Sequence, residues 1–329
     1  MRNAVTHQAA PSPSNHPFIR RLATRIALPD QGCWLLDFLV RRFTYLDRAA
    51  WQADISAGRV LVNSVSATAE QTLSAGDLVE YQPPLLIEPE IATDYCVVHE
   101  DDDLLVLDKP APLPCHPGGR YFRNTLWGLL REERRNEAFF FVNRLDRETS
   151  GLVLVAKNEN AARHCARQFA KHEVDKEYLV VVEGEFSDKE VTATGWLTPD
   201  AASPVRKKMR FHSEQPPRDA RHCTTIFSRR EWSNGLSLLA ARPRTGRCHQ
   251  IRATLLALGF PVVGDKLYGV DETFFLRFIG NQLTGADWQR LRNPRQALHA
   301  SRLTINHPAT GGPLILTAPL PAELKNLLR

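Results

Sequence analysis

The sequence predicts an α+β protein, in which helices flank a mixed central sheet and a smaller α+β module precedes it. Runs typical of buried strands, such as 104–108 and 152–156, are separated by helical patterns, such as 159–171, at irregular spacing. This spacing favours a mixed sheet over a doubly wound one. The chain has 329 residues, of which 43% are hydrophobic and 24% charged. That size and composition are typical of a soluble protein with one large and one small domain.

The first 94 residues divide into three expected parts. Residues 1–30 are polar and proline-rich in their first half, and their apolar residues follow neither helical nor strand spacing. This pattern predicts a flexible tail. Residues 31–84 are the small module, because apolar residues follow helical spacing near 34–43 and 49–55 and two later turns each lead into a short strand. Prolines between 83 and 93 predict a linker, which we place at 85–94.

The large domain is expected over residues 95–329. Its predicted helices are 125–134 with Asn124 as the cap, 159–171, 249–258 closed by Gly259, and 286–291. Its predicted strands are 104–108, 139–142, 152–156, 177–182, 236–241 and 297–305. The helix at 159–171 should bury Ala162, Cys165, Ala166 and Phe169 and expose a basic face of Arg163, Arg167 and Lys171.

Positive charge is concentrated in one part of the chain. The net charge is +5, but residues 205–252 alone carry twelve Lys and Arg side chains against three acids, Glu214, Asp219 and Glu231. If these cations share a face, they suit a phosphate backbone. An ordinary solvated surface explains the same residues, and charge alone leaves both possibilities open.

Cysteine usage and hydropathy exclude several classes of protein. The six cysteines include no Cys-x-x-Cys pair, and four of them directly neighbour a histidine. Neighbours on a strand point to opposite faces, so we expect neither a metal site nor disulfides. The chain has no apolar run of about 18 residues and no apolar N-terminal signal. We therefore expect a cytoplasmic protein without a membrane span.

Asp146 is the first candidate for chemistry. It lies between two apolar strands, where a carboxylate must be on a loop or be paired with a cation. Arg144 and Arg147 could hold it ionised, and Thr149, Ser150 and Gly151 supply turn chemistry. From spacing alone, a structural Asp that caps the turn is the favoured explanation, because Asp is a common turn residue.

Tyr178 and Arg252 are the next candidates. Alternation puts Tyr178 on the face of its strand that carries Val180 and Val182, where it could serve core packing or stack on a base. Arg252 lies at the edge of an apolar helix face and needs a carboxylate partner. His249 and Gln250, at the start of that helix, could receive an anion, or the helix could simply begin with polar residues.

Together, several motifs resemble those of the RluA-type pseudouridine synthases. The segment 143–151, Asn-Arg-Leu-Asp-Arg-Glu-Thr-Ser-Gly, is similar to that family's catalytic motif. Segments 100–110, 176–178, 245–265 and 298–308 resemble its opening, tyrosine, arginine and closing motifs, in the same order. Residues 33–84 resemble the alpha-L (S-four-like) RNA-binding domain. Departures from the family pattern are Asn143, Cys248 and the pair Ala253-Thr254.

The resemblance implies the pseudouridine synthase fold, with a largely antiparallel mixed sheet, and isomerisation of uridine in structured RNA. Asp146 would act on the ribose, as nucleophile or as base, with Arg252 as its ion-pair partner and Tyr178 stacked on the uracil. Arg144 would fill the space that the flipped base leaves. The other expected substrate-binding residues are Arg247, His249, Gln250, Lys109 and Thr149. No cofactor or metal is expected, and the protein would act as a monomer.

The same motifs bear on which RNA is the substrate and on which other functions the chain could have. Ribosomal RNA is favoured over transfer RNA, because relatives with an alpha-L domain often act on it. One alternative is a non-catalytic RNA-binding or ribosome-assembly protein that retains the fold. Another is a nucleoside hydrolase or glycosidase, which would need a second carboxylate, and Glu148 is the acid nearest in sequence.

Overall fold

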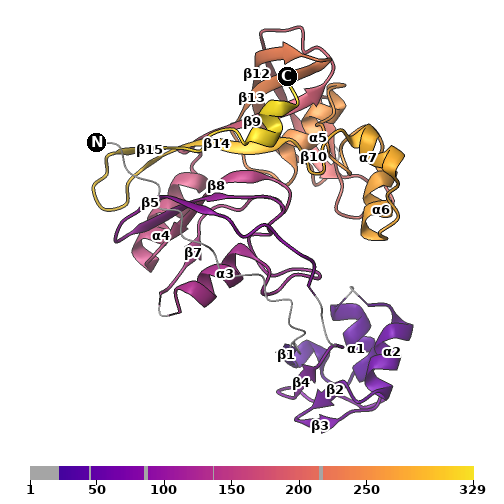
Figure 1. Cartoon of the computed structure of the whole chain (residues 1–329). Helices are drawn as coiled ribbons and strands as arrows, with labels where there is room; N and C mark the ends of the chain where they lie inside the picture. The colour runs from indigo at the N-terminus through magenta and orange to yellow at the C-terminus, as the bar shows by residue number, and fades with distance from the viewer. Residues whose placement is uncertain (1–21, 44–45, 85–87, 136, 215–217) are drawn as a thin grey trace. The chain divides into compact units, whose positions relative to one another are not determined.

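A computed structural model describes residues 22–43, 46–84, 88–135, 137–214 and 218–329. Residues 1–21 of the expected tail and 85–87 of the expected linker lie outside the described residues. The chain forms two compact units (Figure 1). Within the described ranges, the smaller unit comprises 22–90 with 116–124, and the larger comprises 91–115 with 125–329.

The smaller unit contains two helices and a four-stranded antiparallel sheet. Helices α1 (Leu35–Arg42) and α2 (Arg48–Ser56) precede strands β2 (Val60–Val62), β3 (Val65–Ser66) and β4 (Leu78–Tyr81). The structure differs from the expected tail at residues 22–30, where β1 (Leu22–Arg25) pairs with β4 and a 3-10 turn follows. Backbone pairing holds this short edge strand, whose side chains are half-buried at most, so its sequence carries little signal.

One loop from the middle of the chain joins the smaller unit. The Glu88 carboxylate accepts hydrogen bonds of 2.7–2.8 Å from the backbone N–H groups of Phe122, Arg123 and Asn124. The Asn124 side chain donates to a backbone oxygen 3.0 Å away. Asn124 therefore does not cap the next helix, α3 (Leu126–Glu133); Thr125 does, by accepting from the N–H of Gly128.

An 11-stranded sheet organises the larger unit, in the order β11-β10-β12-β13-β9-β14-β8-β6-β5, with β15 beside β14 and β7 beside β8. The pair β14–β8 is parallel and the other pairs are antiparallel. The strands are β5 (Cys96–Glu100), β6 (Leu104–Lys109), β7 (Phe140–Phe141), β8 (Ser150–Ala156), β9 (Asp175–Glu183), β10 (Glu190–Pro199), β11 (Met209–His212), β12 (Arg221–Ser233), β13 (Leu236–Pro243), β14 (Leu298–Asn306) and β15 (Pro313–Thr317).

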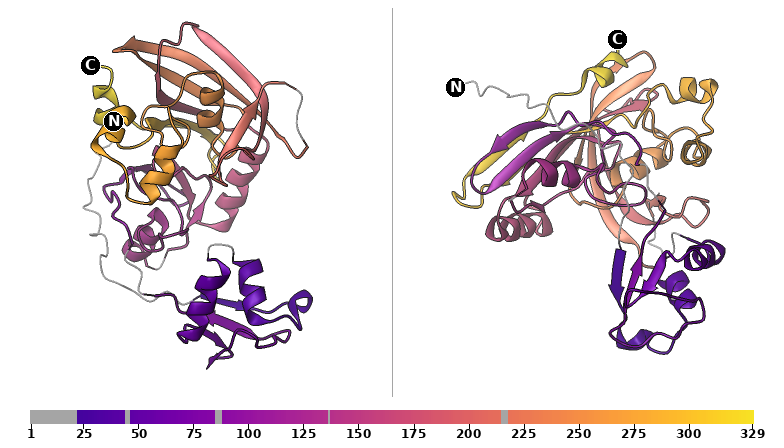
Figure 2. Two further views of the ribbon diagram at one scale, coloured as in Figure 1. Left: turned by 90° about the vertical axis from the view of Figure 1, so that its right-hand side faces the viewer. Right: turned by 60° about the horizontal axis from the view of Figure 1, so that its bottom comes forward.

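Helices flank both ends of this sheet. Helices α3 and α4 (Glu159–Ala170) lie beside β5–β8, whereas α5 (Gln250–Ala257), α6 (Thr273–Ile279) and α7 (Gly285–Leu291) lie near β10–β13 (Figures 1 and 2). Helix α8 (Ala322–Asn326) packs near the C-terminus. The expected α+β class with a mixed, largely antiparallel sheet is confirmed. No helix within the described ranges is long and apolar enough to cross a bilayer.

Several elements differ from the expectation. In α4, Ala166 is exposed and Gln168 is buried instead, because the Gln168 amide exchanges two hydrogen bonds of 2.8 Å with the Asn306 backbone. The expected strand at 139–142 shortens to the two residues of β7. Strands β5, β10, β11, β12 and β15 and helices α6 and α8 were not predicted. Strands β11 and β12 lie in the basic segment, where exposed charges hide the alternation of buried residues.

Candidate active site

Asp146 lies on the loop between β7 and β8, next to the point where β8 pairs with β14 inside the sheet. The N–H of Thr149 donates to the Asp146 carbonyl (3.1 Å), so the backbone does form a turn here. Just beyond, Gly151 has φ +110°, and a Cβ built on it would lie 2.3 Å from the carbonyl oxygen of Ala300 on β14. Glycine therefore allows β8 to pass along β14, and this close pairing fixes the end of the loop.

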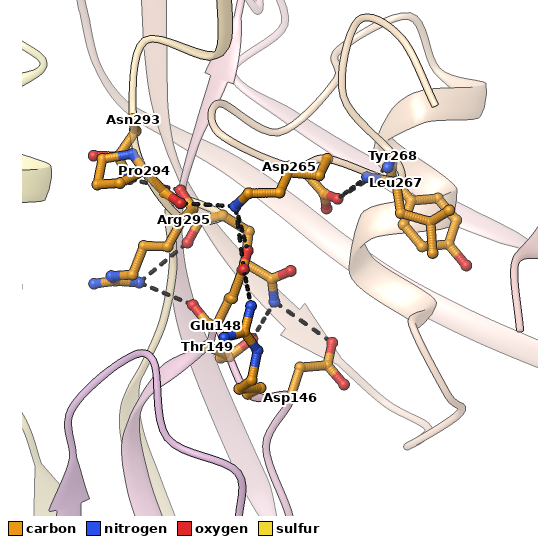
Figure 3. Close-up of polar contacts among 12 residues, drawn as sticks. Asp146, Glu148, Thr149, Asp265, Leu267, Tyr268, Asn293, Pro294 and Arg295 are labelled. Atoms are coloured by element: carbon orange, nitrogen blue, oxygen red, sulfur yellow. Dashed lines mark hydrogen bonds and ion pairs between the residues drawn. The ribbon is translucent and has the colours of Figure 1, made fainter. Parts of the chain in front are cut away.

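The Asp146 carboxylate is held by a buried arginine rather than used as a turn cap. Arg252 Nη1 lies 2.8 Å from Asp146 Oδ2. The remaining guanidinium nitrogens, Nε and Nη2, bond both oxygens of Asp265 at 2.5 and 2.8 Å. Asp265 is fully buried, and its Oδ1 also accepts from the N–H groups of Leu267 and Tyr268 at 2.9 Å (Figure 3). One arginine thus links two carboxylates, and Asp146 alone remains partly open, with 34% of its side chain exposed.

Electrostatics keep Asp146 ionised and His249 neutral. Burial is the largest single effect and would raise the pKa of Asp146, but its polar neighbours, Arg252 foremost, together outweigh it, and the pKa lies below the usual range. Burial and, after it, the neighbouring charge of Arg252 lower the pKa of His249 to about 4. His249 Nε2 lies 3.8 Å from Asp146 Oδ1. A carboxylate with one cationic partner and one neutral imidazole therefore faces the site at neutral pH.

A pocket of about 400 Å³ opens in front of this carboxylate. It is lined by Asp146, Tyr178 and Leu298 together with the segment 245–252. Tyr178 packs beside the cluster that contains Val180 and Val182, as alternation predicted, and its ring also borders the pocket. Burial and the charge of Asp146 raise the pKa of Tyr178 to about 12, so its phenol is neutral at physiological pH. The pocket therefore offers a flat ring and a charged oxygen within one volume suited to a small ligand.

The structure brings most of the expected substrate-binding residues to this pocket. Arg144 and Arg247 are exposed on its lining, and Arg247 Nε donates to the His222 carbonyl (3.3 Å). Thr149 also lines it and accepts a 2.5 Å hydrogen bond from Gln296. His249 adopts the left-handed conformation (φ +56°) at the start of α5. Cys248, one of the departures from the family pattern, lies exposed at the same place.

Gln250 and Lys109 have other partners. The Gln250 carbonyl oxygen accepts from Thr245 Oγ1 (2.7 Å) and the N–H of Arg247 (3.0 Å), and its amide donates to Thr224 and Thr225. Gln250 thus fixes the loop that carries Arg247. Lys109 is fully buried, donates to the carbonyls of Pro110 and Leu113, and is not among the described residues that line the pocket. Burial lowers the pKa of Lys109 to about 8.

Three further residues support the site and were not singled out by the sequence reasoning. Asp265 orients Arg252, Gln296 lies 3.5 Å from Asp146 Oδ2, and the Tyr268 ring lies 4.7 Å from the Arg252 guanidinium. The signal for Asp265 was present, because a buried Arg252 requires more anionic oxygen than Asp146 alone supplies. Gln296 and Tyr268 have no comparable signal in the sequence, since their roles depend on neighbours 150 and 19 residues away.

The basic segment 205–252 carries less unpaired positive charge in the folded protein than its sequence suggests. Acids from other parts of the chain pair with six of its twelve cations. Glu177 binds Arg230 and Arg242, and Glu272 binds Lys208. The other pairs are Arg229–Glu185, Arg244–Asp175 and Arg252 with Asp146 and Asp265. The segment therefore does not form one uniform positive face.

One cluster among the described residues has metal-ligand composition: His99, Asp101 and His307. Both histidines lie with Nε2 2.7–2.8 Å from Asp101 Oδ2. His307 Nδ1 accepts from the N–H groups of Ala309 and Thr310, so the neutral ring carries its hydrogen on Nε2. That nitrogen donates to Asp101 and has no lone pair for an ion. The cluster is thus a hydrogen-bond network between β5 and the loop after β14.

Comparison with known proteins identifies the family. Residues 103–257 match the RNA pseudouridylate synthase family. The mitochondrial tRNA pseudouridine(32) synthase of Saccharomyces cerevisiae is 33% identical over 243 residues, which cover 73% of this chain and about half (51%) of that protein. Ribosomal large subunit pseudouridine synthase C of Yersinia pestis is 30% identical over 328 residues, 96% of each chain.

Solved structures agree with this relationship. The human RNA pseudouridylate synthase domain containing 1 is 26% identical with a TM-score of 0.54, over 70% of this chain and 83% of that one. The expected pseudouridine synthase fold is therefore confirmed. The large unit contains the motif-bearing segments 100–110, 143–151, 176–178 and 245–265 in one sheet-and-helix framework. The chain belongs to the RluA-type RNA pseudouridine synthases, a family of isomerases.

Proposed function

We propose that this enzyme converts selected uridines of structured RNA to pseudouridine and that Asp146 is its catalytic group. One observation carries the proposal: an ionised carboxylate, 2.8 Å from Arg252, borders the same 400 Å³ pocket as the ring of Tyr178. Asp146 is the one carboxylate among the described residues that line this pocket. A flipped nucleotide can present its ribose to the carboxylate and its base to the ring.

The reaction exchanges one bond of the sugar for another. The bond from ribose C1′ to uracil N1 breaks, the base turns, and a bond from C1′ to C5 forms. The C5 hydrogen leaves as a proton and N1 gains one, so no oxidant or energy source is needed. Asp146 acts either as nucleophile at C1′ or as base at C2′, and both roles require the ionised form that Arg252 stabilises. Tyr178 stacks on the base, and Arg144 occupies its vacated place in the RNA.

The contacts of the neighbouring acids disfavour a glycosidase. Hydrolysis of a glycosidic bond usually needs a second carboxylate as acid or base. Glu148, the acid nearest in sequence, pairs with Arg147 at 2.5 Å and with Lys266 at 3.0 Å. Asp265 is fully buried against Arg252. Product analysis separates the two chemistries, because a hydrolase releases free uracil and an isomerase leaves pseudouridine in the chain.

The direct test replaces the carboxylate. We expect Asp146→Ala and the isosteric Asp146→Asn to abolish pseudouridine formation while RNA affinity stays within about two-fold, because the many phosphate contacts remain. Asp102→Asn, on an exposed turn, is the matched control and should retain full activity. Turnover by Asp146→Ala within about 100-fold of wild type would exclude Asp146 as catalytic group. A wild-type protein that binds RNA without modifying it would support the non-catalytic alternative.

Ribosomal RNA is the substrate we propose. The Yersinia pestis relative, whose name refers to the ribosomal large subunit, aligns over 96% of both chains, whereas the yeast relative, whose name refers to tRNA, aligns over 51% of its own length. Position-resolved mapping of pseudouridine in cells with and without this protein tests the assignment. Loss of a site in transfer RNA alone would contradict it.

A groove beside the active-site pocket supports binding to an RNA backbone. It has a volume of about 360 Å³, shares Lys176 and Pro243 with the active-site pocket, and also contains Arg242, Arg244 and Arg302. The two acids of the groove pair with Arg242 and Arg244. Neither Lys176 nor Arg302 belongs to an ion pair within the described ranges, so both are available to the phosphates that flank the target uridine.

The remaining parts of the proposal concern the whole chain. The resemblance of the smaller unit to the alpha-L domain supports a role for it in RNA binding. We propose that the protein acts as a monomer in the cytoplasm, where its RNA substrate is made. Light scattering of the purified chain and fractionation of cells that express it from its own promoter test these two statements.

A further inference from the structure

A short chain of polar contacts lies behind the Asp146 carboxylate. The phenol of Tyr268 is fully buried in the segment between α5 and α6. The backbone N–H of Met209 donates to the Tyr268 oxygen at 2.7 Å. His249 Nδ1 lies 2.9 Å from that same oxygen, and His249 Nε2 lies 3.8 Å from Asp146 Oδ1. The phenol is thus connected to the proposed catalytic carboxylate through one imidazole.

The donors and acceptors of this chain determine where the hydrogens lie. An amide N–H can only donate, so the Tyr268 oxygen accepts from Met209. The phenol has one hydrogen of its own, and His249 Nδ1 is the acceptor beside it among the described residues. The hydroxyl therefore donates to Nδ1. An imidazole that accepts at Nδ1 carries its own hydrogen at Nε2, the nitrogen nearest Asp146.

The surroundings of His249 favour the neutral ring as well. Cations face it from α5 (Arg252) and from the segment between β10 and β11 (Lys207), and anions face it from the β7–β8 loop (Asp146) and from the loop after α5 (Asp265). Burial lowers its pKa to about 4, with Arg252 acting in the same direction. A second proton would have to go to Nδ1, where it would displace the hydrogen bond from Tyr268.

We propose that Tyr268 is a positioning residue, which keeps His249 neutral and points its Nε2–H towards the carboxylate of Asp146. Asp146 then has one full cation, Arg252, and one polarised N–H at 3.8 Å, an electrostatic contact that is too long for a hydrogen bond. A protonated His249 would add a second cation, which would stabilise the carboxylate further and make it a weaker nucleophile or base. The inference rests on the proposed role of Asp146 in the reaction.

Tyr268→Phe tests this role, because it removes the hydroxyl and keeps the ring beside Arg252. We expect the single-turnover rate at pH 8 to fall about five- to ten-fold, the effect of one lost hydrogen bond. His249 loses the hydrogen bond that favours its neutral form, so its pKa should rise, although burial and Arg252 still hold it below the usual value. The deficit should therefore grow as the pH falls from 8 to 5.5. RNA affinity should not change. Tyr95→Phe is the matched control, since Tyr95 is also buried and donates to a side chain, Glu133.

A spectroscopic readout separates positioning from a simple loss of packing. Nitrogen NMR of ¹⁵N-histidine-labelled protein should find His249 as the Nε2–H tautomer in wild type and in Tyr95→Phe, and a shift towards the Nδ1–H or charged form in Tyr268→Phe. In a His249→Gln background, which has no ring to titrate, Tyr268→Phe should cause no extra loss at low pH.

An unchanged tautomer, or a wild-type to Tyr268→Phe rate ratio that is the same at pH 5.5 and pH 8, would overturn the proposal. The tautomer is observed without RNA, so this result does not depend on the proposed function. Failure of Asp146 as the catalytic group would appear instead in the activity of Asp146→Ala.

Discussion

Asp265 and Arg252 form a bidentate ion pair, and this pair determines where the third guanidinium nitrogen points. Two hydrogen bonds of 2.5 and 2.8 Å hold the guanidinium against both oxygens of the Asp265 carboxylate. Nη1 is then left 2.8 Å from Asp146. Asp265 is held in turn by two backbone N–H groups of its own turn. The position of the proposed catalytic carboxylate thus depends on a residue that does not line its pocket.

We predict that Asp265→Asn impairs the enzyme without contacting substrate. The amide keeps the shape but removes the charge that orients Arg252, so the single-turnover rate should fall by at least about ten-fold. The buried guanidinium also loses a full partner, which should lower the free energy of unfolding by about 3 kcal/mol. Urea denaturation and single-turnover assays measure both effects. Asp271→Asn, which alters a partly exposed acid, is the control, and equal losses in the two variants would contradict the prediction.

The second prediction concerns pH. In the native protein, burial raises and Arg252 lowers the pKa of Asp146, and the net shift is downward. The carboxylate therefore stays ionised throughout pH 5–8, and the wild-type rate should have no acid limb from Asp146 in that range. In Arg252→Gln the effect of burial remains and the pKa rises, so the rate should increase with pH through a new midpoint above about 5. A flat profile in folded Arg252→Gln protein would argue against Arg252 as the stabilising charge.

Tyr178 can be tested by separating its ring from its hydroxyl. We expect Tyr178→Phe to bind RNA within about two-fold of wild type, because the stacking face is retained. Tyr178→Leu should weaken binding of the flipped nucleotide by about 1–3 kcal/mol. Since the phenol has a pKa near 12, any loss of turnover in Tyr178→Phe should be independent of pH between 6 and 8. Equal RNA affinity for the Phe and Leu variants would contradict the stacking role.

The basic groove predicts a salt effect. Replacing Lys176 and Arg302 together by Gln should weaken RNA binding and reduce the slope of log affinity against log salt by about 2, roughly one per lost phosphate contact. The control replaces Lys325, an exposed lysine on α8 outside the lining of the groove. A parallel variant with Gln at Arg163 and Arg167 compares the groove with the basic face of α4. An unchanged slope in the groove variant would remove the groove from the RNA path.

The sequence alone was sufficient for the fold class and for the ion pair between Arg252 and Asp146, whose catalytic role stays a proposal. Buried strands and amphipathic helices leave periodic patterns that are local in sequence, and the motif segments keep a characteristic order and spacing. The same patterns did not predict β11 and β12, because exposed arginines interrupt the alternation of apolar and polar residues. They did not predict β1 either, because this strand is held mainly by backbone pairing with β4. Charge counted along 205–252 left two interpretations open, because the acids that pair with half of its cations lie elsewhere in the chain.

Tertiary structure decided how the site is assembled. The sequence suggests Lys109 and Gln250 as substrate-binding residues, but both make hydrogen bonds to other groups of the protein. Asp265, Tyr268 and Gln296 gained their roles only because the chain brings them to Arg252, His249 and Asp146. A residue type determines which hydrogens it can give or take. Which partner receives them depends on distances between segments up to 150 residues apart, and those distances are set by the packing of the whole sheet.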